Sequence, residues 1–191
     1  MGRPILRTPL FVTPPLAIVD RPAAPTHFYQ PGYLRQQLVI VLHHTGGRDS
    51  LAWLTRTSSP PVSTQRLINK AGTIFKLMED NDVAYTAGYG VIGPIDPDGN
   101  DPAGVPSNLN WGSLNIELEN LGDGRDPFTI AQMQACADQI VEWWGRFGLL
   151  GVLAHREVDS RKEDPADNFN WRDLYERIDR RYLAVRGRAA A

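Results

Sequence analysis

LVIVLHHTGG, residues 38–47, predicts a strand that ends abruptly in two histidines. Its first five residues are apolar and mostly β-branched, which is typical of a strand buried on both faces. Gly46 and Gly47 then allow the chain to turn. Because side chains alternate along a strand, we expect His43 and His44 to point to opposite faces of the sheet. The two histidines should therefore differ in role.

The composition of the chain is that of a globular domain. It has 191 residues, of which 42% are hydrophobic and 22% charged. The net charge of -2 gives no reason to expect a nucleic-acid partner. No apolar run approaches the roughly 20 residues that cross a bilayer, so we expect no transmembrane segment. The single cysteine, Cys136, excludes an intrachain disulfide framework and is expected to lie on the buried face of a helix.

The first 37 residues hold seven of the fifteen prolines, which excludes a long helix or a central strand there. Prolines at positions 9, 14 and 15 also interrupt the apolar region that a secretory signal needs, so we expect no signal peptide. The segment is nevertheless too apolar for a free linker. We expect residues 1–37 to be an extension that packs on a single folded domain at 38–185, followed by a tail at 186–191.

The remaining pattern predicts strands and helices in alternation. A short helix should follow Asp49 as its cap, and residues 92–110 should form a long loop. Thr129 and Gln132 form a capping box for a helix whose buried face includes Ile130 and Cys136. The further expected elements are a strand–turn–strand unit at 66–78, strands at 114–120 and 151–155, and a helix at 171–185. This order predicts an α/β fold, a single mixed β-sheet flanked by helices.

Two of the predicted strands end in histidine, at His43 and His155. Strand ends are common places for functional sites in sheets covered by helices. Two imidazoles indicate zinc, which often takes a carboxylate as its third protein ligand. The segment after His155 offers several carboxylates, and spacing alone does not choose among them: Glu157, Asp159, Glu163, Asp164 and Asp167.

A further carboxylate lies on the alternating segment LNIELEN, residues 114–120. Leu114, Ile116 and Leu118 should face one side of the sheet, and Asn115 and Glu117 the other. The polar side could simply be solvated. Alternatively, Glu117 faces the site, where burial or a neighbouring metal would adjust its pKa for proton transfer.

Four segments in order resemble the type 2 family of zinc-dependent N-acetylmuramoyl-L-alanine amidases, which includes phage lysozyme-amidases and peptidoglycan recognition proteins. They are VIVLHHTGG, RLINKAGTIFKLMEDNDVAYTAG, SLNIELEN and LAHREVDSRKEDPADNFNW, and they span about residues 38–172. The resemblance implies the fold of that family and a zinc cofactor.

The resemblance also implies the role of each site residue. His43, His155 and Asp164 would be the zinc ligands. Glu117 would be the general base, and Lys162 would approach the substrate oxygen. Substrate contacts are expected from Thr45, Tyr85, Thr86 and Asn115.

The chain departs from the family pattern at three positions. Thr64 stands where some members carry a tyrosine as the base, and Glu117 occupies the position where other members carry a glutamate in that role. Gln65 and Thr86 stand where many members carry histidine. The change at Thr86 bears on how the substrate is oriented rather than on the zinc site.

The implied activity is hydrolysis of the amide between the N-acetylmuramic acid lactyl group and L-alanine of peptidoglycan, by a monomer. A single catalytic domain suits a bacteriolytic, antimicrobial phage endolysin that accumulates in the host cytoplasm and then acts on the cell wall. Three alternatives remain open. They are a peptidoglycan-binding module without activity, a cytoplasmic amidase that recycles muropeptides, and a zinc peptidase of other peptides.

Overall fold

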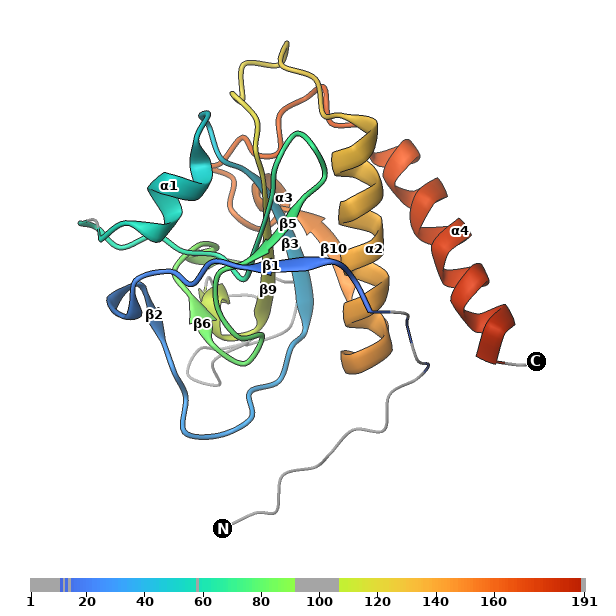
Figure 1. Ribbon diagram of the computed structural model, residues 1–191. Coiled ribbons are helices and arrows are strands. Elements are labelled where there is room, and N and C mark those ends of the chain that lie inside the picture. The colour runs from blue at the N-terminus through green and yellow to red at the C-terminus, as the bar shows by residue number, and fades with distance from the viewer. Residues whose placement is uncertain (1–10, 12, 14, 58, 92–106, 190–191) are drawn as a thin grey trace.

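The computed structural model describes residues 11, 13, 15–57, 59–91 and 107–189. Its centre is a six-stranded sheet in the order β1-β5-β4-β9-β3-β10 (Figure 1). The strands of this sheet are β1 (Ile18–Asp20), β3 (Val39–His44), β4 (Arg66–Ile68), β5 (Ile74–Lys76), β9 (Ser113–Leu118) and β10 (Gly151–Ala154). Four of its five strand pairs are parallel and β4–β5 is antiparallel. The predicted mixed sheet is confirmed.

The remaining elements surround this sheet. Two short antiparallel pairs join β2 (Phe28–Tyr29) to β6 (Val83–Ala84) and β7 (Tyr89–Gly90) to β8 (Ser107–Asn108). The α-helices are α1 (Ser50–Thr55), α2 (Ile130–Phe147), α3 (His155–Val158) and α4 (Trp171–Ala189). Single 3₁₀ turns cover Pro25–His27 and Leu109–Trp111. Helix α2 lies against one face of the sheet, α4 packs on α2, and α1 lies on the other side of the molecule (Figure 1).

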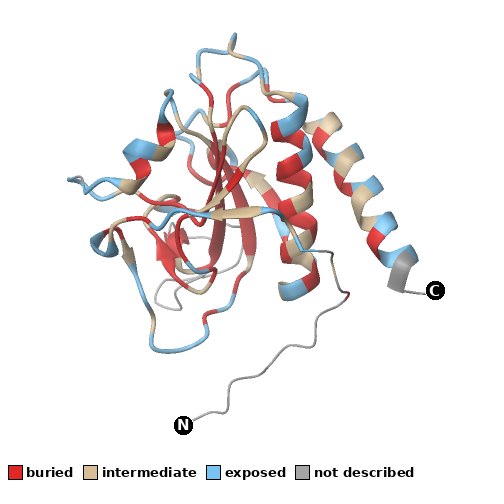
Figure 2. Cartoon of the chain, in the orientation of Figure 1, coloured by how far each residue is buried: buried red, intermediate tan, exposed pale blue. Residues whose placement is uncertain are grey.

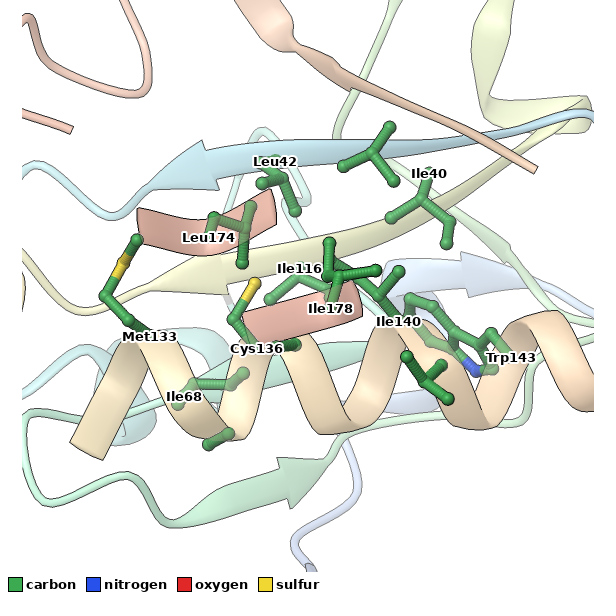
Figure 3. Close-up of a cluster of buried hydrophobic side chains, with 14 of the residues drawn as sticks. Ile40, Leu42, Ile68, Ile116, Met133, Cys136, Ile140, Trp143, Leu174 and Ile178 are labelled. Atoms are coloured by element: carbon green, nitrogen blue, oxygen red, sulfur yellow. The ribbon is translucent and has the colours of Figure 1, made fainter. Parts of the chain in front are cut away.

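The main hydrophobic core lies between the sheet and α2. Alternate residues of the two central strands, among them Ile40, Leu42 and Ile116, are fully buried and face the helix (Figures 2 and 3). Cys136 and Trp143 of α2 pack against them, and Leu174 and Ile178 of α4 close the cluster from outside (Figure 3). Cys136 therefore packs in the core, as predicted, and burial raises the pKa of its thiol.

The opposite face of the central strands is also covered. Val39 and Val41 of β3 pack there with Ala87, Leu109 and Val158, which come from loops and short helices. All six residues of β9 are buried, which excludes the alternative of a solvated polar face on that strand. The odd-numbered residues of β3 and the polar residues of β9 share this second face. It is the face on which polar chemistry can be sheltered from water.

Helix α2 begins as the sequence predicts. The Thr129 hydroxyl accepts a hydrogen bond from the Gln132 backbone, and the Gln132 side chain accepts one from the Thr129 backbone. Gly148 follows the helix with a φ of 100°, which favours glycine. The assignment of Ile130 to the buried face is wrong, because this first helical residue extends beyond the packed surface and is 75% exposed.

Several predicted boundaries differ from the structure. Asp49 precedes α1 but has a left-handed φ of 55° and makes no side-chain cap. Strand β10 ends at Ala154, so His155 is the first residue of α3 rather than the end of a strand. Helix α4 continues past 185 to Ala189. Most of the predicted loop at 92–110 lies outside the described residues, and its last part forms β8 and a 3₁₀ turn.

The proline-rich extension contributes to both the sheet and the core. Strand β1 pairs with β5 alone and forms an edge of the sheet, which is compatible with nearby prolines. Phe11 is buried in the main core and contacts the Tyr182 ring of α4. Among the described helices, none combines the length and the apolar character needed to cross a membrane.

Gly72 allows the tight turn between β4 and β5 to lie against α2. Its φ is 79°, and a Cβ there would sit 2.6 Å from the Ala131 carbonyl oxygen. Gly124 has a similar φ of 69° with nothing within 4 Å, so it serves as a matched control. We expect Gly72→Ala to lower the free energy of unfolding by about 1–3 kcal/mol more than Gly124→Ala does. Urea unfolding of both variants measures the difference, and equal losses would contradict this packing argument.

Candidate metal centre

The site lies where the parallel strands β3, β9 and β10 end at the same edge of the sheet. His43 of β3 is paired in register with Glu117 of β9, so their side chains share one face. His155 follows β10 directly, as the first residue of α3. Asp164 lies on the loop after α3, and its backbone carbonyl accepts a hydrogen bond from the Arg156 backbone. Three stretches of the chain that are distant in sequence, around residues 43, 117 and 155–164, therefore meet at this edge.

Three potential ligand atoms converge there. The Nδ1 atoms of His43 and His155 are 3.0 Å apart. Oδ2 of Asp164 lies 2.9 Å from the first and 3.0 Å from the second. Both histidines are almost fully buried, and the Asp164 side chain is 14% exposed. Two imidazole nitrogens and one carboxylate oxygen at such spacing form a donor set suited to a metal ion, zinc above all.

The outer nitrogen of each imidazole is occupied by another group. Nε2 of His155 donates to the Ala87 carbonyl oxygen over 3.1 Å. Nε2 of His43 lies 3.1 Å from Oδ1 of Asn115. With the proton on Nε2, the Nδ1 lone pairs are directed to the centre of the cluster, which is the arrangement a metal requires.

The electrostatics favour the metal-binding protonation states of His43 and Asp164. Burial lowers the pKa of His43, although Asp164 partly opposes the shift, so the imidazole is neutral near pH 7. Burial alone would raise the pKa of Asp164. The close contacts of its carboxylate with His155 and His43 outweigh that effect and hold the pKa of Asp164 far below its usual range. Neutral imidazoles and an ionised carboxylate are the forms that bind metal.

The other carboxylates after His155 have different partners. Glu157 accepts a hydrogen bond from the Ala154 backbone, and Asp159 pairs with Arg161. Asp167 pairs with Arg156, and Glu163 is exposed. Of the five candidates from sequence, Asp164 is the one that contacts both histidines.

Glu117 is buried beside the three ligand atoms with part of its hydrogen-bonding capacity unused. The residue is 8% exposed, and Oε2 has no hydrogen-bond partner within the described part of the chain. Burial, together with the negative charge of Asp164, raises its pKa to about 8, while Lys162 opposes the shift. A buried carboxylate with a raised pKa next to a cluster of ligands is characteristic of a proton-transfer group.

An open cavity of ≈ 210 Å³ leads to Glu117. The loop after β3 and helix α1 provide its other walls: Thr45, Gly46, Gly47, Arg48, Ser50, Trp53 and Leu54. Trp53 is 41% exposed, and the Arg56 guanidinium lies over its ring. The cavity therefore combines a carboxylate, an arginine and an accessible indole.

The other residues expected at the site are either at least partly accessible to a substrate or completely buried. Thr45 lines the cavity, Lys162 is exposed close enough to act on Glu117, and Tyr85 is half-buried. Thr86 is also half-buried, but its hydroxyl donates to the Ser63 carbonyl.

Asn115 is the residue that is completely buried. It is fully buried and contacts His43, so its side chain has no surface to offer a substrate. Asn115 is therefore placed to support His43 rather than to contact a substrate. Sequence reasoning also missed Ala87, because a backbone carbonyl leaves no signature in the side-chain pattern.

His44 has the separate role that the alternation predicts. Its Nδ1 accepts a hydrogen bond from the Ala166 backbone over 3.0 Å, on the side of the sheet away from Glu117. A Cβ at Gly122 would lie 2.5 Å from its ring, so the 122 loop is closely packed on it. Because Ala166 is two residues from Asp164, His44 helps to hold the ligand loop in place.

The raised pKa of Glu117 makes a prediction about stability. The folded-state value of about 8 exceeds the ordinary value of 4.5, so the folded chain holds this proton more tightly than the unfolded chain. The free energy of unfolding of the metal-free protein should therefore fall as pH rises between these values. Glu117→Gln lacks this effect, so its stability relative to wild type should be higher at about pH 9 than at about pH 5 by ~4 kcal/mol.

Urea unfolding in the presence of a chelator at both pH values measures this difference. A difference between Glu117→Gln and wild type that stays constant with pH would contradict the raised pKa.

Comparisons with known proteins agree on one family. The sequence profile of the N-acetylmuramoyl-L-alanine amidases matches residues 34–167. The fold resembles a selenomethionine derivative of AmpD, with a TM-score of 0.65, 20% identity, and coverage of 85% of this chain and 94% of that one. For the endolysin LysCS from Clostridium intestinale the values are 0.56, 17%, 85% and 95%.

A third similar structure is the N-acetylmuramyl-L-alanine amidase AmiD from E. coli, in complex with the substrate anhydro-N-acetylmuramic acid-L-Ala-D-gamma-Glu-L-Lys. Its TM-score is 0.61 at 26% identity, over 80% of this chain and 66% of AmiD. A search of curated proteins finds none that matches. The matched profile covers more than half of the chain and includes every residue of the ligand cluster. The chain belongs to the N-acetylmuramoyl-L-alanine amidase family of hydrolases.

Proposed function

We propose that the protein is a zinc-dependent peptidoglycan amidase that cleaves the bond between the N-acetylmuramic acid lactyl group and L-alanine. The observation that carries this proposal is the convergence of His43, His155 and Asp164 beside the buried carboxyl of Glu117. Family membership supports the reaction, and the muropeptide bound in the AmiD structure supports the substrate class.

His43, His155 and Asp164 would hold the zinc ion through two nitrogens and one oxygen. Three protein ligands are typical of catalytic zinc sites, where the metal activates a water molecule and polarises a carbonyl group. The unpartnered Oε2 of Glu117 fits this assignment, because a buried polar atom requires a partner that the described residues do not provide. The ligand set is proposed from this fit and from the family resemblance.

Glu117 would act as the general base and then as the general acid. It would accept a proton from the attacking water and deliver it to the leaving nitrogen of L-alanine. Its pKa of about 8 leaves it mainly protonated at neutral pH when no cation is near. A neighbouring positive charge favours the ionised form, so zinc binding would convert the group into a base.

Lys162 would stabilise the carbonyl oxygen as it gains negative charge. Its ammonium group is exposed and acts electrostatically on Glu117, which is compatible with a position at the mouth of the site. Thr45, Tyr85 and Thr86 would contact the glycan or the stem peptide. Thr45 has the strongest support of these three, because it lines the cavity that leads to Glu117.

A non-catalytic recognition module is the alternative from another class. Such a protein would not need a complete ligand set together with a buried carboxyl of raised pKa, and this chain has both. A zinc peptidase acting on other peptides would share the same chemistry and differ in the shape of the groove. The family match favours peptidoglycan over other peptides.

We propose a phage endolysin as the biological role, acting on the cell wall after accumulation in the host cytoplasm. The fold similarity to LysCS is compatible with this role. The similarity to AmpD is equally compatible with a muropeptide-recycling amidase. The two roles differ in whether the protein attacks intact sacculi or soluble fragments.

Two substitutions separate metal binding from proton transfer. Glu117→Gln should retain zinc and lose turnover by about 10²–10⁴-fold, because a buried amide cannot accept the proton. Asp164→Asn should lose zinc as well as turnover, because the negative ligand is removed. Elemental analysis of the purified proteins gives zinc content, and release of stem peptides gives turnover. An active Glu117→Gln variant, or full zinc content in Asp164→Asn, would require a different assignment.

Digestion of purified sacculi tests both the reaction and the role. We expect mass spectrometry to detect free stem peptides that begin with L-alanine, and a chelator to abolish them. An endolysin should act on sacculi at least as well as on soluble anhydro-muropeptides, whereas a recycling enzyme should strongly prefer the latter. Absence of stem peptides from both substrates would favour the recognition module.

A further inference from the structure

Gln65 lies behind His43 and does not reach the cavity. It is fully buried on the segment before β4. Its Oε1 accepts hydrogen bonds from the Asn115 backbone N–H over 2.9 Å and from Nδ2 of Asn115 over 3.2 Å. Its Nε2 donates to the Asp82 carbonyl oxygen over 2.9 Å. Each end of the carboxamide is therefore bonded to a backbone group whose polarity cannot change.

This arrangement fixes the orientation of the next amide. Because the backbone N–H of Asn115 is always a donor, and the Asp82 carbonyl always an acceptor, Gln65 must turn its oxygen towards Asn115. Asn115 then turns its NH₂ group towards Gln65 and Ser113, whose Oγ is 3.0 Å away. Its remaining atom, Oδ1, faces His43.

The orientation of Asn115 in turn fixes the proton on His43. An amide oxygen can only accept, so Nε2 of His43 must donate. In the neutral imidazole, which burial favours, Nδ1 then carries the lone pair. His155 reaches the same state directly, through the Ala87 carbonyl. Nε2 of His43 contacts the Asn115 side chain instead of a backbone carbonyl. The orientation of that side chain is fixed by Gln65, which is itself held by two backbone groups.

We propose that Gln65 is a positioning residue that, through Asn115, holds His43 in the tautomer whose Nδ1 can bind a metal. Without the Gln65 oxygen, the Asn115 amide can turn over and present its NH₂ group to His43. Nε2 would then accept, the proton would move to Nδ1, and that nitrogen could no longer serve as a ligand. The link to catalysis rests on the proposed function, whereas the link to the tautomer does not.

Three variants of the full-length protein test this proposal. Gln65→Met removes the amide at similar size. Gln65→Glu keeps an acceptor for both Asn115 donors but loses the bond to the Asp82 carbonyl, so it is the conservative variant. Gln132→Met removes another fully buried amide, which bonds the Ile68 and Glu119 carbonyls away from the ligands, and it controls for a general loss of stability.

Two measurements are made on each variant. Long-range ¹H–¹⁵N correlation spectra of the metal-free protein show which ring nitrogen of His43 carries the proton. Competition with a chelator gives the affinity for Zn²⁺. We expect Gln65→Met to populate the Nδ1–H form and to bind zinc at least about tenfold more weakly. Gln65→Glu and Gln132→Met should keep the Nε2–H form and zinc affinity within about threefold of wild type, even where they unfold more easily.

The contradicting results are specific. An unchanged tautomer and zinc affinity in Gln65→Met would overturn the proposal, as would an equal loss in Gln132→Met. If Gln65→Met does not fold, Gln65→Leu removes the same amide, with the same expected shift and the same contradiction. If the wild type has the Nε2–H form on His43 but does not bind Zn²⁺, the proposed function fails and the positioning role remains.

Discussion

The parallel pairing of β3 with β9 is the constraint on which the rest of the structure depends. Its register sets His43 opposite Glu117 and Ile40 opposite Leu114. A shift of one residue in either strand would exchange the two faces of that strand. Buried leucines and isoleucines hold the register on the helix side, where α2 and α4 cover them. The core thus determines which polar side chains are sheltered on the other face.

That sheltered face holds several polar groups that would be costly to bury without partners. The histidines, Asp164, Asn115 and Gln65 reduce this cost by bonding one another and the backbone. Glu117 is the exception, since one of its oxygens has no partner among the described residues. An unsatisfied carboxyl beside a ligand cluster destabilises the metal-free fold, and under the proposed function it would be the group that transfers protons.

Much of this arrangement follows from local sequence patterns. Alternation separates His43 from His44 and places Glu117 on the face of His43, and the capping box marks the start of α2. Pairwise contacts across long separations do not follow in the same way. Nothing in the spacing distinguishes Asp164 from Asp159, because the difference arises from Arg161 pairing with Asp159 in the folded loop.

The role of Asn115 also depends on tertiary structure. A polar residue on a strand that faces a site resembles a substrate contact until the packing of β3 against β9 buries it completely. The Ala87 carbonyl and the Gln65 amide become visible only through their hydrogen bonds. Sequence therefore identified the chemistry at the centre of the site more completely than the groups that orient it.

The central claim is that two imidazoles and one carboxylate bind zinc. X-ray absorption spectroscopy of the zinc-loaded protein at the metal's K edge tests it most directly. The account predicts one zinc ion per chain in a four-coordinate shell of nitrogen and oxygen at about 2.0–2.2 Å, with scattering from two imidazole rings. The account would be contradicted by a shell containing sulfur, by a six-coordinate shell of oxygen alone, or by scattering that corresponds to less than one imidazole ring per zinc.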